Sequence, residues 1–115
     1  MRKEAKIALG IFLVLFALIL AGCEEEVVTP DAPFISGSFT STINTIRWSG
    51  VYGAEQYIIY YGNYSGSSDP STFTRLGTTK ANSYSDTTTY KRYYAVKASN
   101  SAGTSGFSNV IFLGD

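Results

Sequence analysis

The residue best suited to covalent chemistry in this chain is its single cysteine, Cys23. The three residues before it are Leu20, Ala21 and Gly22, and they end a nearly unbroken apolar run that begins at Ile7. Basic residues precede that run at positions 2, 3 and 6. A basic start, an apolar middle and a small-residue cleavage site are the pattern of a secretory signal peptide. The sequence therefore predicts an exported chain that is cut close to Cys23.

Leu20-Ala21-Gly22-Cys23 resembles the lipobox of bacterial lipoproteins. The resemblance implies cleavage between Gly22 and Cys23 and a covalent diacylglyceryl and N-acyl lipid, such as palmitate, on Cys23. Residues 1–22 would then be a helical signal peptide that is removed, and the acyl chains would hold the mature chain at a membrane. Glu24 stands where an aspartate would imply retention in the inner membrane. The resemblance therefore implies a cell-envelope location, at the outer membrane or cell surface, or at the outer face of the cytoplasmic membrane in an organism with one membrane.

Three other interpretations of this N-terminal segment are weaker. A retained transmembrane helix needs about 17 to 20 apolar residues, and the run from residue 7 to residue 22 is shorter and ends in three glutamates. If the segment were an ordinary signal peptide, the cysteine directly after Leu-Ala-Gly would be a coincidence. A buried structural cysteine does not fit beside three glutamates.

The rest of the composition excludes most site chemistry. The chain has no histidine and no second cysteine, so the commonest general base and the ligands that zinc and copper prefer are missing. The remaining acids show no paired spacing. We therefore expect no enzyme activity, no metal site and no cofactor besides the lipid on Cys23. Residues 23–115 carry six Lys/Arg and eight Asp/Glu, a net charge of −2, which argues against a nucleic-acid partner.

The mature chain divides into a tether, residues 23–32, and a domain, residues 33–115. Three consecutive glutamates favour an extended tether, and Pro30 and Pro33 stiffen its exit. The domain is rich in Tyr, Thr, Ser, Val and Ile, with turn-forming residues between the apolar runs. Seven short strands are expected, over residues 34–39, 42–49, 55–62, 72–77, 83–87, 90–100 and 109–113. This pattern predicts an all-β fold, a seven-stranded immunoglobulin-like sandwich of two sheets.

Alternation along three of these strands predicts the core of the sandwich. Side chains two residues apart in a strand share one face of the sheet. The predicted core residues are Ile46, Trp48, Tyr57, Ile59, Tyr61, Tyr94, Val96 and Ala98. We interpret the only tryptophan as a packing residue near the centre of the core, not as a ligand contact.

Several segments resemble strands of the fibronectin type III family, in the family's order and spacing. They are Ala32-Pro33 at the start of strand A, Ile46-Arg47-Trp48 in strand B, 53–61 in strand C, 73–77 in strand C′, 82–87 in strand E, 94–103 in strand F and the F–G loop, and 108–110 at the start of strand G. The resemblance implies a single domain from about residue 32 onward. One departure is Arg92, which stands at the tyrosine-corner position, so that the corner is either shifted or absent. The E–F connection is also short.

The same alternation gives a first set of candidate binding residues. With the core side chains of the strand 55–62 pointing inward, Ile58 and Tyr60 point outward. The pairing of strands C and F that the resemblance implies adds Tyr93 to them. An exposed apolar stripe of this kind can mark a binding site. The plainer interpretation, which we favour at this point, is that tyrosine covers an exposed sheet well.

The loops give a second set. Tyr52, in the expected B–C loop, lies at the same end as the expected F–G loop, residues 99–107, which carries Phe107. Tyr64 lies in the long C–C′ loop at the other end. Exposed aromatic side chains at these positions could stack on sugars.

These features favour a non-catalytic, lipid-anchored binding or adhesion module that acts through protein–protein interaction in the cell envelope. A first alternative is a module that binds cell-wall or external glycans. A second alternative is a small structural lipoprotein subunit of an envelope complex. The fold alone does not separate the three.

Overall fold

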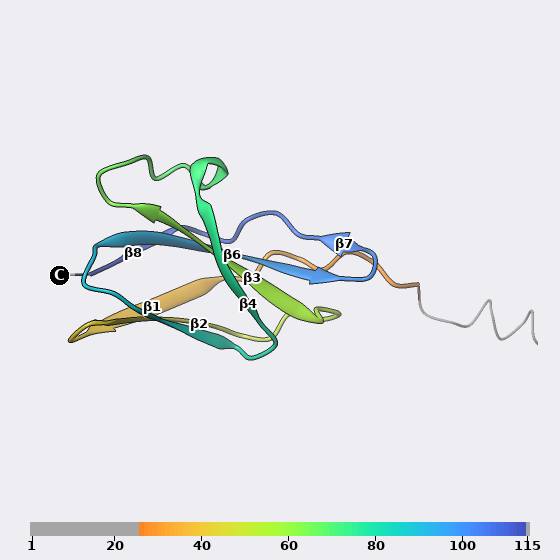
Figure 1. Ribbon diagram of the computed structural model, residues 1–115. Coiled ribbons are helices and arrows are strands. Elements are labelled where there is room, and N and C mark those ends of the chain that lie inside the picture. Colours follow the sequence, from red (N-terminus) through yellow and green to blue (C-terminus); the bar gives the residue numbers. More distant parts are fainter. Residues whose placement is uncertain (1–25, 115) are drawn as a thin grey trace, which may run out of the picture.

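Two antiparallel β-sheets face each other in the computed structural model, which describes residues 26–114 (Figure 1). The smaller sheet has the strand order β1-β2-β5, with bounds Ile35–Thr40, Ile43–Trp48 and Ser83–Thr87. The larger sheet has the order β4-β3-β6-β7, with β8 also paired to β6. Its bounds are β3 Gln56–Asn63, β4 Thr74–Thr79, β6 Arg92–Asn100, β7 Gly103–Thr104 and β8 Ile111–Leu113.

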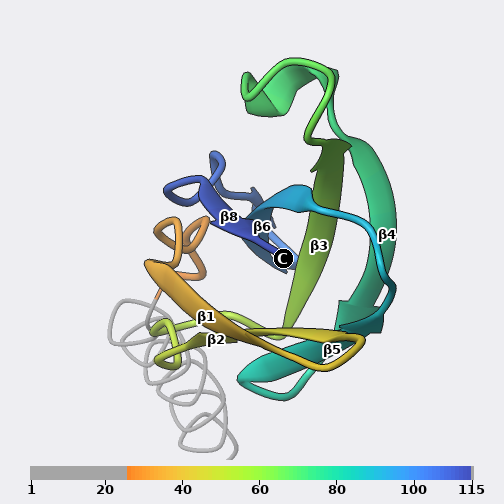
Figure 2. The same ribbon diagram turned by 90° about the vertical axis from the view of Figure 1, so that its left-hand side faces the viewer.

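The predicted all-β, two-sheet class is confirmed, and the two layers are seen edge-on in Figure 2. The predicted signal peptide, residues 1–22, and the lipidation site Cys23 lie outside the described residues. Among the residues that are described, no helix is both long and apolar enough to cross a membrane. A single 3-10 turn, η1 (Pro70–Thr72), interrupts the connection from β3 to β4.

The inward face of the larger sheet follows from the register of its two central strands. Tyr57 lies opposite Ala98, Ile59 opposite Val96, and Tyr61 opposite Tyr94. These side chains meet the inner face of the smaller sheet, and together they form one core. Its buried members are Ile35, Ile46, Trp48, Tyr57, Ile59, Tyr94, Val96, Ala98 and Leu113. The ring of Trp48 lies 5.2 Å from that of Tyr57, while Tyr61 is only half-buried at the margin of the core.

The last expected strand differs from the structure. Two short strands, β7 and β8, pair with opposite ends of β6, so the expected 99–107 loop is a tight turn that β7 follows. Between the two strands the chain bulges, and two serines carry the ladder there. Ser105 and Ser108 donate their backbone N–H groups to the carbonyls of Ala98 and Val96, and their hydroxyls accept from the N–H groups of the same two residues. Here serine hydroxyls take the place of the backbone carbonyls that would accept these bonds in a regular strand. The alternating sequence pattern that marks a strand is therefore lost over this segment.

The segment that precedes β1 is attached to the domain. We name residues 26–33 the N-terminal strap; its two prolines, Pro30 and Pro33, are buried. The side-chain amide of Asn100 donates to the carbonyl of Val28 at 2.8 Å. A Cβ atom on Gly103 would lie 2.8 Å from the hydroxyl of Thr29, so the close approach of the strap requires glycine there. The strap therefore leaves the domain at the Asn100 end of β6, whereas the C-terminus lies at the opposite end (Figure 1).

Candidate functional site

The outward side of the larger sheet carries a layer of aromatic side chains, which we name the outer aromatic face. It is built from five separate parts of the chain: β3, the β3–β4 connection, β6, the bulged segment after β7, and β8. Its members are Tyr60, Tyr64, Phe73, Tyr93, Phe107 and Phe112. Tyr64 and Phe112 are 52% and 42% exposed, and the other four are half-buried.

One half of the face is arranged around Tyr93. Its ring stacks with that of Phe73 at 6.4 Å and 13°, and lies 5.6 Å from Phe112 and 6.2 Å from Tyr64. Tyr64 in turn lies 4.9 Å from Phe112. Rings at these separations stabilise one another beyond the area that they bury. The long β3–β4 connection is thereby fixed on the outside of β6 and β8.

Glycine 62 makes that stacking possible. It lies opposite Tyr93 in the register of β3 and β6, on the outward side. A Cβ atom at this position would lie 2.5 Å from two ring carbons of Phe73. The ring of Phe73 therefore lies directly over the backbone of β3. Any residue with a side chain at position 62 would displace that ring.

The other half of the face covers Ile58, and the expectation that Ile58 is exposed is wrong. Ile58 is 7% exposed although it points to the outward side, opposite Lys97. Phe107 reaches across from the bulged segment, with its ring 5.0 Å from Tyr60 and 4.1 Å from the ammonium of Lys97. Phe107 thus lies over the two neighbours of Ile58 on this side of the sheet, Tyr60 on the same strand and Lys97 opposite it. Tyr60 and Phe107, not Ile58, form the surface.

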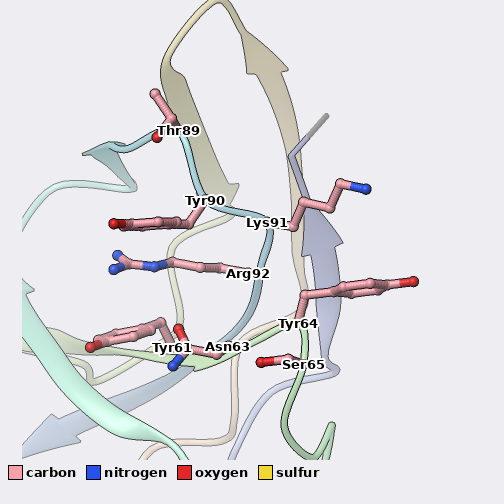
Figure 3. Close-up of a pocket in the computed structure, with 8 residues that line it drawn as sticks. All are labelled: Tyr61, Asn63, Tyr64, Ser65, Thr89, Tyr90, Lys91 and Arg92. Carbon is pink, nitrogen blue, oxygen red and sulfur yellow. The ribbon is translucent and has the colours of Figure 1, made fainter.

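A groove of about 600 Å³ opens where the outer aromatic face meets the Arg92 end of β6 (Figure 3). Its lining residues are Tyr61, Asn63, Tyr64, Ser65, Thr89, Tyr90, Lys91 and Arg92. The guanidinium of Arg92 lies between two rings, 4.0 Å from the centre of Tyr61 and 5.7 Å from that of Tyr90 (Figure 3). Tyr90 is 66% exposed. The sequence did not single it out as a contact residue, because it follows a run of threonines with no alternating pattern.

Beneath the groove a buried polar network joins the two sheets. Arg92 donates to the carboxylate of Asp86 at 2.8 Å, and the hydroxyl of Tyr94 donates to the same oxygen at 2.5 Å. Asn44, fully buried on β2, donates its side-chain amide to that hydroxyl at 2.9 Å. Burial, followed by the hydrogen bond to Asp86, raises the pKa of Tyr94 far above its ordinary value.

Arg92 thus closes the end of the sandwich at the position where the resemblance placed a tyrosine. It does so through a charge pair with Asp86, whose side chain is 10% exposed, while that of Arg92 is 15% exposed. The sequence held one signal for this network. Asn44 has the same phase along β2 as the core residues Ile46 and Trp48, and a polar residue on a core face requires a partner.

The predicted loop residues do not form one site. Tyr52 is 83% exposed, but it lies in the β2–β3 connection beside Gly53 and Asn100, at the opposite end of β6 from Tyr64. Phe107 lies on the sheet face against Tyr60. Of the three candidate sugar contacts, only Tyr64 lines the groove.

The groove and the outer aromatic face offer aromatic rings, cations and hydrogen-bonding groups. The outer aromatic face offers apolar rings with the cations Arg75, Lys91 and Lys97 on its strands or beside them. The groove adds the amide of Asn63 and the aliphatic hydroxyls of Ser65 and Thr89. In residues 26–114 no group of three potential ligands lies close enough together to hold a metal ion.

No protein-family model matches the sequence, and no curated protein matches it. Several solved structures share the fold. An Fn3-like protein from Clostridium thermocellum has a TM-score of 0.62 and 25% identity, over 73% of this chain and 91% of that one. The crystal structure of FN3tt has a TM-score of 0.59 and 25% identity, over 76% of this chain and 97% of that one. A beta-1,2-glucanase from Parabacteroides distasonis has a TM-score of 0.61 and 22% identity, over 76% of this chain and 13% of the enzyme.

The first two of these proteins are themselves fibronectin type III domains, and the match covers nearly all of their length. Their similarity agrees with the strand arrangement found here, in which β1, β2 and β5 face a larger sheet centred on β3 and β6. The described part of the chain is therefore a single domain with the fibronectin type III fold.

Proposed function

We propose that this protein is a non-catalytic, lipid-anchored binding module of the bacterial cell envelope, and that it contacts another envelope protein through the outer aromatic face. The observation that carries the proposal is the face itself. Six aromatic side chains from five parts of the chain gather on the outward side of the larger sheet, which is the side that does not face the core. Large patches of apolar rings on a small domain mark interaction surfaces.

A protein partner fits this surface better than a small ligand does. Four of the six rings are half-buried, so the face offers broad contact area and few projecting groups. Two lysines lie against its rings, Lys97 over Phe107 and Lys91 over Tyr64. Aromatic residues are enriched at protein interfaces and carry much of the binding energy there.

The test is to capture partners from native membranes with the intact lipoprotein and to repeat the capture with Tyr60→Ser combined with Tyr93→Ser. We expect the double variant to lose the partner and to keep both sheets and the core, because both side chains are on the outward side, even though the β3–β4 connection loses its ring contacts with Tyr93. Tyr52→Ser is the matched control, since it removes an exposed tyrosine at the other end of the domain. Circular dichroism and the unfolding midpoint check that both variants are folded.

A partner that binds the double variant as well as the wild type contradicts the proposed surface. A partner lost equally with Tyr52→Ser places the contact at the other end. If no protein is retained at all, the structural-subunit and glycan hypotheses gain support. The mass of the native protein, compared with that of Cys23→Ala, reports separately on cleavage and lipidation.

One observation favours carbohydrate binding as the second candidate. The groove combines the exposed rings of Tyr64 and Tyr90 with the polar side chains of Asn63, Ser65 and Thr89. A sugar ring could stack on an aromatic face while its hydroxyls bind the polar groups. Titration with cell-wall and plant glycans, followed by NMR shifts of residues 63–65 and 89–92, tests this hypothesis. Shifts that disappear in Tyr90→Ala would support it, and an unchanged spectrum with all glycans would exclude it.

A further inference from the structure

We infer that the Asn100 end of the domain is a second, separate surface, which docks on the neutral lipid surface of the membrane. The surface consists of Val27, Val28 and Tyr52, and we name it the strap patch. Their exposed fractions are 60%, 57% and 83%, which places them among the most exposed large apolar side chains in the described part of the chain. The inference rests on the proposed lipid anchor at Cys23 but not on the proposed protein partner.

The strap patch is held together by one side chain. The amide nitrogen of Asn100 donates to the carbonyl of Val28 at 2.8 Å and to that of Gly53 at 3.0 Å. The N-terminal strap and the β2–β3 connection, far apart in the sequence, are thereby fixed side by side around a shallow pocket. The carbonyl oxygen of Asn100's side chain accepts from the N–H groups of Ala102 and Gly103, so its orientation is fixed as well.

The position of the patch in the chain brings it to the membrane. Val27 is four residues after Cys23, a segment that spans at most about 14 Å when fully extended. The headgroup layer on one side of a bilayer is itself about 5 to 8 Å thick. A lipid on Cys23 would therefore keep the strap patch within a short distance of the interface whatever path residues 23–26 take.

The chemistry of the patch suits that interface. Valine side chains gain from burial in the acyl boundary, and tyrosine places an apolar ring there with its hydroxyl toward water. Two acids, Glu26 and Glu55, line the same pocket. They disfavour a negatively charged surface, so the geometry points to zwitterionic lipids such as phosphatidylcholine and phosphatidylethanolamine.

Docking of this end would orient the whole domain. The strand β6 runs from Arg92 to Asn100, which corresponds to about 26 Å. With the Asn100 end on the membrane, the opposite end of the sandwich, where the chain reaches its C-terminus, points away from it (Figure 1). The groove lies at that far end, because Lys91 and Arg92 line it. The binding surfaces would then be presented to the space beyond the membrane.

The experiment uses residues 23–115, coupled through Cys23 to a maleimide lipid in phosphatidylcholine vesicles. This chain contains both sheets and the whole core, and Cys23 is its only thiol. Tyr52→Trp adds a reporter to the strap patch, and Tyr90→Trp, at 66% exposure in the wild-type residue, is the matched reporter at the other end. Trp48, buried in the core, gives the same background in both variants. The readouts are the emission wavelength and quenching by brominated lipids.

We expect the emission of the tryptophan at position 52 to shift to the blue and to be quenched, and that at position 90 to show neither change. Val27→Ser with Val28→Ser should abolish both effects, and anionic lipid should weaken them. Equal quenching at both positions, or none at position 52, would overturn the inference. A blue shift that grows with protein concentration without vesicles would overturn it in favour of self-association. The anchor in this experiment is synthetic, so the result does not depend on native lipidation. The mass of the native protein tests native lipidation separately, and a failure there is therefore distinguishable from a failure of docking.

Discussion

The two ends of β6 are closed by different means. At the Arg92 end a charge pair with Asp86 and the hydroxyl of Tyr94 are buried between the sheets. At the Asn100 end, exposed hydrogen bonds from one amide hold the strap to the surface. A buried charge pair is costly to break, because each partner left alone keeps its desolvation penalty, whereas an exposed hydrogen bond is readily exchanged for water.

The two ends of this small domain therefore differ in how firmly they are held. The Arg92 end supports the groove on a network that fixes Tyr61 and Tyr90 around a guanidinium. The Asn100 end carries the segment that leads to the proposed anchor, and the hydrogen bond from Asn100 to that segment is exposed. We therefore expect substitutions at the Arg92 end to affect global stability, and those at the Asn100 end to affect the strap locally.

Among these substitutions, Arg92→Ala should lower the free energy of unfolding most, and it tests the comparison between the two ends of β6 most directly. It leaves the carboxylate of Asp86 buried without its cation, and we expect the free energy of unfolding to fall by about 3 to 5 kcal/mol. The neighbouring, exposed Lys91→Ala is the control and should cost less than about 1 kcal/mol, because it loses only a contact with the ring of Tyr64. Chemical denaturation of both variants measures the difference. If the two variants lose equal amounts of unfolding free energy, the buried charge pair does not make the Arg92 end different from the Asn100 end.

Alkaline pH should weaken the same end by a smaller amount. The pKa of Tyr94 is raised in the folded state, so its neutral form contributes stability that is fully present below pH of about 10 and is lost as the pH rises above that value. We expect the loss to be about 1.4 kcal/mol for each pH unit while the folded protein keeps this proton. Tyr94→Phe should unfold more easily at neutral pH, because Asp86 and Asn44 lose a partner, but its stability should fall less steeply from pH 10 to 12. Identical slopes in denaturation series would refute this assignment.

Asn100→Ala should have the smallest effect on the whole domain. It removes two exposed bonds to the carbonyls of Val28 and Gly53 and two within the β6–β7 turn, at a cost of about 1 kcal/mol in unfolding free energy. Hydrogen exchange should quicken in the strap and in the β6–β7 turn while the amides of β3 and β6 stay protected. Asn63→Ala, an exposed asparagine at the opposite end, is the control and should leave the strap unchanged. Faster exchange throughout both sheets would mean that the strap is part of the global fold.

The fold class and the inward faces of the strands could be predicted because they depend on a local pattern. Tyr57, Ile59 and Tyr61 alternate on one strand, and an apolar face of period two has to be buried wherever the strand lies. The outward face could not be predicted in the same way. Ile58 is buried because Phe107, from a distant segment, lies over its neighbours, and the bulge that places Phe107 depends on hydroxyls accepting from β6.

The outer aromatic face could be predicted for two of its outward residues but not in its grouping. The outward direction of Tyr60 and Tyr93 follows from the strands that carry them. The addition of Tyr64, Phe73 and Phe112 depends on how the β3–β4 connection folds back over Gly62. Tyr52 has the same side chain and similar exposure to Tyr90, yet the topology places the two at opposite ends.

By itself, the sequence determined the all-β fold, the inner faces of the strands and the cysteine motif that predicts an anchor, because each depends on the spacing of neighbouring residues. Only the tertiary structure decided which aromatic side chains meet, which polar residues are buried together and which end of the domain carries the strap. Those outcomes depend on contacts between segments far apart in the chain, and the energies of such contacts are set by the pairing and packing of whole sheets.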